Sequence, residues 1–252
     1  MIYFVSDIHL GAGDAKQAKR TEQAFCRWLD AIAKDATCIY LMGDIFDFWF
    51  EYRRVVPQGF VRVLGRLAQL LDRGVKVVFY AGNHDMWCYD YLEKECGIEV
   101  VRAPRVEVVN GAKLHLAHGD NMNIHGDPML KLMNRAFRSN VLRAIFSWLI
   151  HPDLFLKFGQ WWSGKSRKSH STENITSDNL HYLVDYAREH RSQNNDVLAY
   201  IFGHMHLPYR HTEDDLDVLF MSDWSGARAT YIVMDDSNNL ELKTFDIDET
   251  VS

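Results

Sequence analysis

Five short apolar runs in this chain each end in a cluster of polar residues. The runs are Ile2 to Val5, Cys38 to Met42, Val75 to Ala81, Leu114 to Ala117 and Leu198 to Phe202. Each is rich in β-branched or aromatic residues and short enough to be a buried strand. In open α/β sheets, ligand sites lie outside the carboxyl ends of the strands. The pattern therefore predicts an α/β fold in which five strand ends build one polar site.

Helical patterns between the first runs support a parallel sheet. Apolar residues follow a 3.6-residue period from Ala24 to Ile32 and again from Phe60 to Leu71. Alternation of strands and helices is typical of parallel sheets. Three later runs, Val218 to Met221, Thr230 to Val233 and Leu240 to Phe245, are separated by turn residues and predict an antiparallel meander. We expect a mixed, two-sheet α/β sandwich that forms a single domain.

The polar clusters contain the residue types that bind metal ions. In chain order they are Asp7-Ile8-His9, Gly43-Asp44-Ile45-Phe46-Asp47, Gly82-Asn83-His84-Asp85, His118-Gly119-Asp120 and Gly203-His204-Met205-His206. On an extended backbone, residues two apart point the same way, so Asp7 and His9 could act as a pair, as could His204 and His206. Mixed oxygen and nitrogen ligands suit manganese, iron, zinc or cobalt better than magnesium or calcium. A carboxylate that bridged two ions would hold them ~3.5 to 4 Å apart, as two-metal phosphatases require.

Taken in this order, the motifs resemble the calcineurin-like metallophosphoesterases over residues 7 to 206. The resemblance implies a four-layer α/β/β/α sandwich with two divalent ions, of which manganese is the expected metal. It implies that Asp7, His9, Asp44 and His206 bind one ion and that Asp44, Asn83, His118 and His204 bind the other. It also implies catalytic roles for His84, as a donor to the phosphate or leaving oxygen, and for Asp85, which would orient His84.

Longer matches indicate one branch of this family. The segments Gly43 to Trp49, His118 to Asp120 and Gly203 to Pro208, with a helical insertion between the last two, resemble enzymes that hydrolyse the pyrophosphate of UDP-2,3-diacylglucosamine in lipid A biosynthesis. That branch usually has arginine at the position of His84. The resemblance implies UMP and 2,3-diacylglucosamine 1-phosphate as products.

Two alternatives to this activity stay open. The same site could act on another nucleotide or on a soluble phosphodiester. The chain could also be a binding scaffold that has the fold but no activity. All of the implied metal-ligand positions are occupied by suitable residues, which argues against the scaffold.

An insertion at about residues 122–170 differs in charge from the rest of the chain. It carries eight Lys and Arg against two Asp, so its net charge is +6, whereas the remainder carries −12. Asp127-Pro128 predicts a helix start, and a wide apolar face follows. The insertion could be a helical hairpin buried against the body. It could instead be a lid whose apolar surface receives an acyl chain or a membrane, with cations for phosphates.

Several residues are expected to contact the substrate because they lie near the motifs or in the insertion. They are Asn83, Asp120, His125, Trp161, Trp162, Lys165, Arg167 and Lys168. Tryptophans next to a basic run are typical of segments that lie at a membrane interface. The expected partners are therefore an acylated nucleotide sugar and a membrane surface.

Composition and the start of the chain predict where the protein works. The chain begins with an apolar run without a basic start, so we expect no secretory signal, and no apolar run reaches the ~18 residues that span a bilayer. Four cysteines without CxxC pairing fit reduced thiols. A net charge of −6 argues against nucleic-acid binding. We expect a cytoplasmic protein, peripheral on the inner face of the cytoplasmic membrane.

Overall fold

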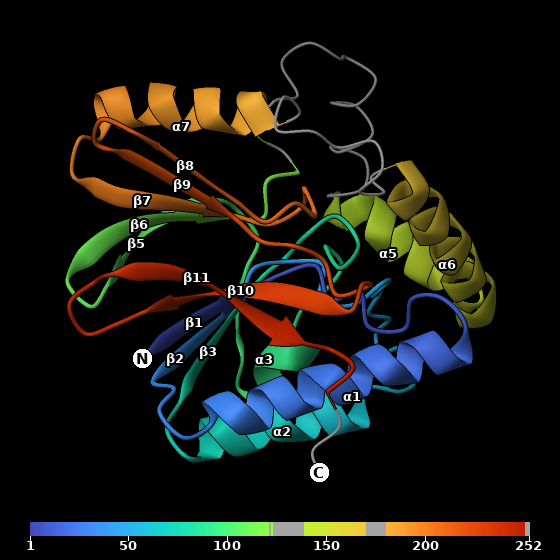
Figure 1. The fold of residues 1–252 in the computed structure, drawn as a ribbon. Helices are drawn as coiled ribbons and strands as arrows, with labels where there is room; N and C mark the ends of the chain where they lie inside the picture. Colours follow the sequence, from blue (N-terminus) through green and yellow to red (C-terminus); the bar gives the residue numbers. More distant parts are fainter. Residues whose placement is uncertain (121, 123–138, 170–179, 250–252) are drawn as a thin grey trace.

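The computed structural model describes residues 1–120, 122, 139–169 and 180–249. Two β-sheets pack face to face, and helices cover the outer face of each sheet (Figure 1). This α/β/β/α arrangement confirms the two-sheet sandwich that the sequence predicts.

The first sheet is mixed. Its strands, in spatial order, are β11 (Leu240–Asp246), β10 (Arg228–Met234), β1 (Ile2–Val5), β2 (Cys38–Leu41), β3 (Lys76–Tyr80) and β4 (Glu99–Val101). Strands β1 to β4 run parallel, and the chain between them forms α1 (Ala15–Ile32), α2 (Val61–Asp72) and α3 (Tyr91–Cys96). Helix α1 begins after Asp14, whose side chain accepts the backbone N–H of Gln17. The alternation of strands and helices thus produces the expected parallel arrangement.

The second sheet has three parallel strands between two antiparallel edge strands. In spatial order the strands are β5 (Arg105–Val109), β6 (Ala112–Ala117), β7 (Val197–Phe202), β9 (Leu216–Phe220) and β8 (Tyr209–Glu213). Helix α7 (His181–Gln193) packs on the outer face through Leu183, Val184 and Ala187. The carboxyl ends of β6 and β7 therefore lie next to each other, which brings His118 and Gly203 together.

The C-terminal strands do not form the single meander that we expected. Strand β9 pairs in parallel with β7 in the second sheet, whereas β10 and β11 form a hairpin in the first. In the connection between β9 and β10, Met221 packs in the core between the sheets and Trp224 packs edge-on against Phe25 of α1. Burial of these two side chains requires the chain to cross between sheets, and local sequence spacing does not reveal this.

Strand side chains alternate between two separate hydrophobic cores. In β1, Tyr3 and Val5 belong to the core shared with α1 and α2, while Phe4 belongs to the core between the two sheets. Strand β2 repeats the pattern, with Ile39 facing the helices and Tyr40 facing the other sheet. Because both faces are buried, the strands are apolar throughout and do not alternate with polar residues.

The described part of the insertion consists of α5 (Asn140–Leu149) and α6 (Pro152–Ser169). One face of α6 is buried, where Phe155 packs with Phe48, Phe50 and Trp87. The expected helix start at Asp127-Pro128 lies outside the described residues. None of the helices in the described ranges is long and apolar enough to cross a membrane.

Candidate metal centre

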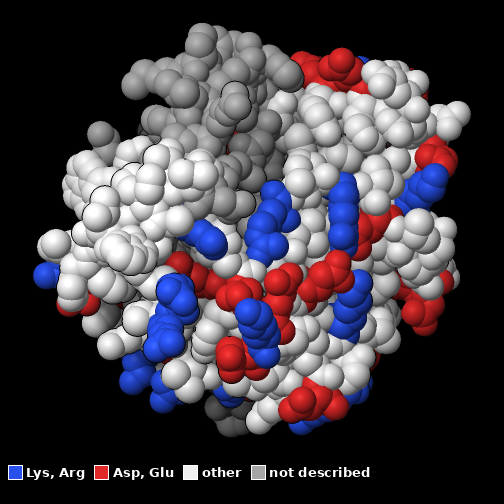
Figure 2. All heavy atoms as spheres, turned by 180° about the vertical axis from the view of Figure 1, so that it is seen from behind, with Lys and Arg blue, Asp and Glu red and all other residues white. Residues whose placement is uncertain are grey.

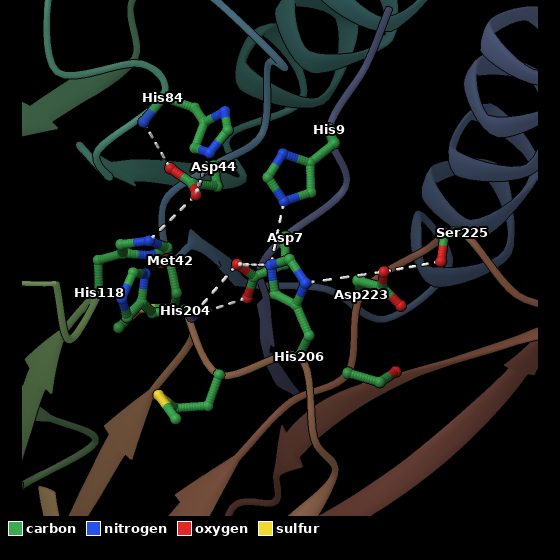
Figure 3. A network of polar contacts seen from close by, with 12 residues as sticks. Asp7, His9, Met42, Asp44, His84, His118, His204, His206, Asp223 and Ser225 are labelled. Carbon is green, nitrogen blue, oxygen red and sulfur yellow. Dashed lines mark hydrogen bonds and ion pairs between the residues drawn. The ribbon is translucent and has the colours of Figure 1, made fainter. Parts of the chain in front are cut away.

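The loops that follow five strands meet at one edge of the sandwich and bring seven acidic and histidine side chains together (Figure 3). Each loop directly follows a strand: β1, β2 and β3 in the first sheet, and β6 and β7 in the second. The side chains are those of Asp7, His9, Asp44, His84, His118, His204 and His206. The structure therefore brings together seven of the residues that the motifs single out, as convergence of strand ends predicts.

These side chains fall into two neighbouring groups. In the first, His206 Nε2 lies 3.3 Å from Asp7 Oδ1 and 3.2 Å from His9 Nε2. In the second, His118 Nε2 lies 3.3 Å from Asp44 Oδ2, and one ring nitrogen of His204 completes a set whose atoms all lie within 4.8 Å of one another. Asp44 also forms a set of this size with His9 and His84. It therefore lies between the two groups, where a bridging carboxylate has to be.

Two buried acceptor atoms indicate that the site fits cations. The ring of His118 donates from Nδ1 to the carbonyl oxygen of Met42 at 2.9 Å, because a carbonyl can only accept. In the neutral ring, which is the form that binds a metal ion, the lone pair is therefore on Nε2. That Nε2 and Asn83 Oδ1 are buried with no hydrogen-bond donor among the described residues. An unpaired buried acceptor costs about 1 to 3 kcal/mol, and coordination to a divalent ion would offset that cost. Carboxylate, amide and imidazole donors together suit such an ion.

Charge in the site favours metal binding as well. Burial raises the pKa of Asp44, but the neighbouring His118 and His84 lower it more, so its pKa lies well below the usual value. The pKa of Asp7 is lowered in the same way. Burial raises it, but the hydrogen bond and the charge interaction with His206 bring it below the usual value. Burial and the nearby His84 lower the pKa of His9 well below its usual value. Ionised carboxylates and a neutral imidazole are the forms that bind metal ions.

The backbone presents the candidate ligands differently from our expectation. Five of them, Asp7, His9, Asp44, His204 and His206, have φ between 50° and 67°. Such left-handed conformations cost of order 1 to 3 kcal/mol at non-glycine residues and cluster at functional sites. The argument from extended backbone was therefore wrong for His204 and His206, which join different groups, in agreement with the separate ions that the family resemblance implies. The turn conformation separates the two side chains, because the chain has already left the strand at Phe202.

Gly82 allows two loops to approach each other closely. A Cβ atom at this position would lie 2.2 Å from Asp44 Oδ1 and 2.6 Å from the Asp44 backbone nitrogen. Any side chain would therefore displace the carboxylate that joins the two groups. The glycine before Asn83 is thus required by the position of Asp44.

Asp85 does not orient the His84 ring, which corrects our expectation. Its carboxylate accepts backbone N–H groups of Gly82 at 2.8 Å, Ile45 at 2.8 Å and Phe46 at 3.2 Å. Burial and the nearby Asp44 raise the Asp85 pKa to about 7. Strands β2 and β3 are neighbours, so the side chain reaches across to the β2 loop as well as to Gly82 of its own loop. Asp85 thereby holds the loop that carries Asp44.

The His84 ring contacts two groups that motif analysis did not include among the site residues. Its Nδ1 lies 2.8 Å from the Asp47 carbonyl oxygen and 2.7 Å from Ser163 Oγ, while Nε2 lies 3.8 Å from Asp44 Oδ2. Asp47 could have been found from the Gly-Asp-x-x-Asp spacing. Ser163 comes from α6 of the insertion and lies in no motif, so the sequence carries no signal for it.

Asp223 is a further neighbour of the site that the sequence does not reveal. Its Oδ2 lies 3.8 Å from His206 Nδ1, and the hydroxyl of Ser225 donates to the same carboxylate at 2.7 Å (Figure 3). The residue lies in the connection from β9 to β10, whose crossing from the second sheet to the first was not predicted. Metal-binding histidines usually donate their other ring nitrogen to such a carboxylate.

The remaining residues that we expected to contact substrate are only partly described. Asp120 follows His118 and lines a small hollow with Arg102 and Gly119. Trp161 and Trp162 lie on α6 with exposed side chains. Lys165, Arg167 and Lys168 lie on the same helix, but their side chains are outside the described part of the chain, as is His125.

Carboxylate and imidazole groups at the strand ends of an α/β/β/α sandwich define a metallohydrolase site. The family model of the calcineurin-like phosphoesterases matches residues 1–208. The UDP-2,3-diacylglucosamine hydrolase of Porphyromonas gingivalis is 37% identical over 236 residues, which cover 88% of this chain and 90% of that protein. The enzyme of the same name from Haemophilus ducreyi is 26% identical, over 93% of this chain and 96% of its own.

A solved archaeal phosphodiesterase is 10% identical, with a TM-score of 0.48 over 96% of this chain and 98% of its own. The chain belongs to the calcineurin-like phosphoesterases. Membership confirms a hydrolase that acts on phosphate bonds, and together with the Asp and His groups it confirms the prediction of divalent metal ions.

Proposed function

We propose that this protein hydrolyses the pyrophosphate of UDP-2,3-diacylglucosamine to UMP and 2,3-diacylglucosamine 1-phosphate. The names of the similar enzymes from two bacteria support the substrate. The observation that carries the proposal is an apolar cavity on the same helix that reaches the candidate metal centre. A phosphoesterase site next to apolar volume fits a substrate with both a pyrophosphate and acyl chains.

The cavity lies between the insertion and the body and has a volume of about 300 Å³. It is lined by Trp87, Arg143, Phe146, Ile150, Leu154, Phe155 and Phe158. That volume is at the lower end of small-molecule sites, which are mostly apolar with few polar groups. From Phe155 to Ser163, helix α6 rises ~12 Å, a distance that an acylated sugar phosphate can span.

The residues of the two groups are proposed to hold two ions, with manganese as the expected metal. Asp7, His9, Asp44 and His206 would hold one, and Asp44, Asn83, His118 and His204 the other. When bound, such ions would polarise water for attack and neutralise charge on the phosphate oxygens. His84 turns Nε2 toward Asp44, and the doubly protonated ring would donate from this nitrogen to the phosphate or leaving oxygen. Asp85 would act by holding the Asp44 loop.

Exposed apolar side chains support contact with a membrane surface. On α5 and α6 they include Val141, Trp148, Leu149, Leu154 and Trp161, with Trp148 83% exposed. The surface over these helices, at the left of Figure 2, is largely uncharged, while acidic and basic side chains interleave lower on the same face. Clustered apolar exposure of this kind is typical of interaction sites and interfacial helices. We therefore propose a cytoplasmic enzyme that is peripheral on the membrane, without a nucleic-acid partner.

Product analysis tests the proposal. The purified protein, stripped of metal and reconstituted with Mn²⁺, should release UMP from UDP-2,3-diacylglucosamine in detergent micelles. UDP-N-acetylglucosamine, which lacks the long acyl chains, should be hydrolysed much more slowly. Calcium should restore little activity, since imidazole ligands disfavour this hard ion. Rapid turnover of bis(p-nitrophenyl) phosphate with none of the acylated substrate would favour a soluble phosphodiester instead.

A further inference from the structure

We infer that Ser163 of the insertion is a positioning residue for His84, so that seating of helix α6 contributes to the chemical step. The inference rests on the proposed role of His84 at the phosphate. The juxtaposition that carries it is a buried hydroxyl from α6 placed between the His84 ring and the Asp47 carboxylate. Ser163 is fully buried although it lies on a helix whose opposite face is exposed.

The hydrogen-bond directions follow from the chemistry of the three groups. The Asp47 carbonyl oxygen, 2.8 Å from His84 Nδ1, can only accept, so Nδ1 carries a hydrogen. The hydroxyl of Ser163 donates its single hydrogen to Asp47 Oδ1 at 2.5 Å. Its oxygen accepts from His84 Nδ1 at 2.7 Å. The ring is thereby held on one edge, and its Nε2 edge is turned toward Asp44.

A stripe on α6 explains why the hydroxyl reaches this position. Phe155, Gly159 and Ser163 are spaced four residues apart and so share one face of the helix. Phe155 packs on Phe50 with ring centroids 4.5 Å apart. A Cβ atom at Gly159 would lie 2.2 Å from the Phe48 ring, so only glycine lets the helix approach this closely. The stripe docks α6 against the loop that carries Asp47, and Ser163 is its last described contact.

The same helix thus contacts both the proposed acyl cavity and the proposed catalytic histidine. Phe155 and Phe158 line the cavity, while Ser163 lies two turns further along. An occupant of the cavity that stabilises α6 in its docked position would stabilise the His84 ring as well. Binding energy from a remote part of a substrate can raise kcat in this way.

A double-mutant cycle tests the inference. Four forms of the metal-reconstituted protein are compared: wild type, Ser163→Ala, His84→Ala and the double variant. With bis(p-nitrophenyl) phosphate as substrate, Ser163→Ala should lower kcat about 10-fold or more and leave KM and metal content within about twofold, on the scale of losses of supporting contacts. In the His84→Ala background the same change should have no effect, because the residue acts through that ring. Ser147→Ala on α5, whose hydroxyl donates to the Ala144 carbonyl oxygen of its own helix turn, is the control.

Equal losses of kcat in both backgrounds would overturn the inference and leave Ser163 a structural residue, as would a wild-type kcat in Ser163→Ala. Should the His84→Ala forms be too slow to assay, side-chain ¹⁵N NMR of the zinc-reconstituted protein decides. The ring nitrogen signals of His84 should shift or broaden in Ser163→Ala, and unchanged signals would overturn the inference. A generic diester reports on the site even if UDP-2,3-diacylglucosamine is not the substrate, so failure of the two proposals can be told apart.

Discussion

The Asp85 carboxylate accepts the backbone N–H of Ile45 at 2.8 Å and so ties the loop after β3 to the loop that carries Asp44. Asp85→Asn places an amide NH₂ or a weaker acceptor against several N–H groups. We expect metal affinity to fall about 10- to 100-fold, as for other residues that support metal ligands. Isothermal titration calorimetry with Mn²⁺ measures the metal affinity. Asp235→Asn is the matched control, since Asp235 accepts backbone N–H groups in a remote turn.

Asp44 lies between the two groups of candidate ligands, so its loss should affect both. We expect Asp44→Ala, and separately His118→Ala, to lower bound metal and to reduce turnover by at least ~100-fold. Elemental analysis of the purified variants measures metal, and release of UMP measures turnover. A variant with near wild-type activity and full metal content would contradict the two-metal proposal.

His84 should act in the chemical step instead of holding metal. We expect His84→Ala to keep bound metal and lose ~10² to 10⁴ in kcat, the range of general acid catalysis. His84→Arg tests whether a fixed positive charge can replace the imidazole. Retained activity in this variant would support stabilisation of charge on the phosphate, whereas full loss would support proton donation.

The exposed aromatic residues of α6 should matter only for acylated substrate. Replacing Trp161 and Trp162 with Ser should raise KM for UDP-2,3-diacylglucosamine at least tenfold, because burial of one large apolar side chain is worth ~1.5 to 3 kcal/mol. Turnover of bis(p-nitrophenyl) phosphate should be retained. Leu198→Ser, which removes an exposed apolar side chain from β7, should change neither. Equal losses on both substrates would indicate a structural role for the two tryptophans.

His115 should make the fold sensitive to acid independently of metal. Burial and the nearby His190 lower its pKa to about 4, and its Nε2 contacts the hydroxyl of Tyr186 at 3.1 Å. The unfolded chain, with a pKa near 6.5, therefore binds more protons than the folded state between these values. The contribution of His115 to the free energy of unfolding is fully present above about pH 6.5. It is lost as the pH falls toward about 4, by on the order of 2 to 3 kcal/mol.

Urea unfolding of the metal-free protein at pH 7.5 and pH 4.5 measures this loss. The difference between the two pH values should be smaller in His115→Gln than in wild type. His151→Gln, at an exposed position of the insertion, should leave the difference unchanged. If His115→Gln also leaves it unchanged, the acid sensitivity has another origin.

The sequence alone determined what depends on short-range pattern. Runs such as Ile2–Val5 are apolar on both faces, so burial in a parallel sheet follows from their composition. Polar residues directly after the runs must lie at the sheet edge, so Asp7, Asp44 and His118 could be placed in one site before any coordinates. Motif order then indicated the family, because five linked motifs are far more specific than any one of them.

Only the tertiary structure decided what depends on contacts between distant segments. The family resemblance implied separate ions for His204 and His206, but only the structure shows the left-handed turns that send these side chains to different groups. Asp85 binds a neighbouring loop, and Ser163 reaches His84 from an insertion 79 residues away. Strands β9 and β10 separate because Trp224 is buried under α1. Periodicity describes which side of its own element a residue faces, whereas the packing of elements selects the partner, and that selection is a property of the whole fold.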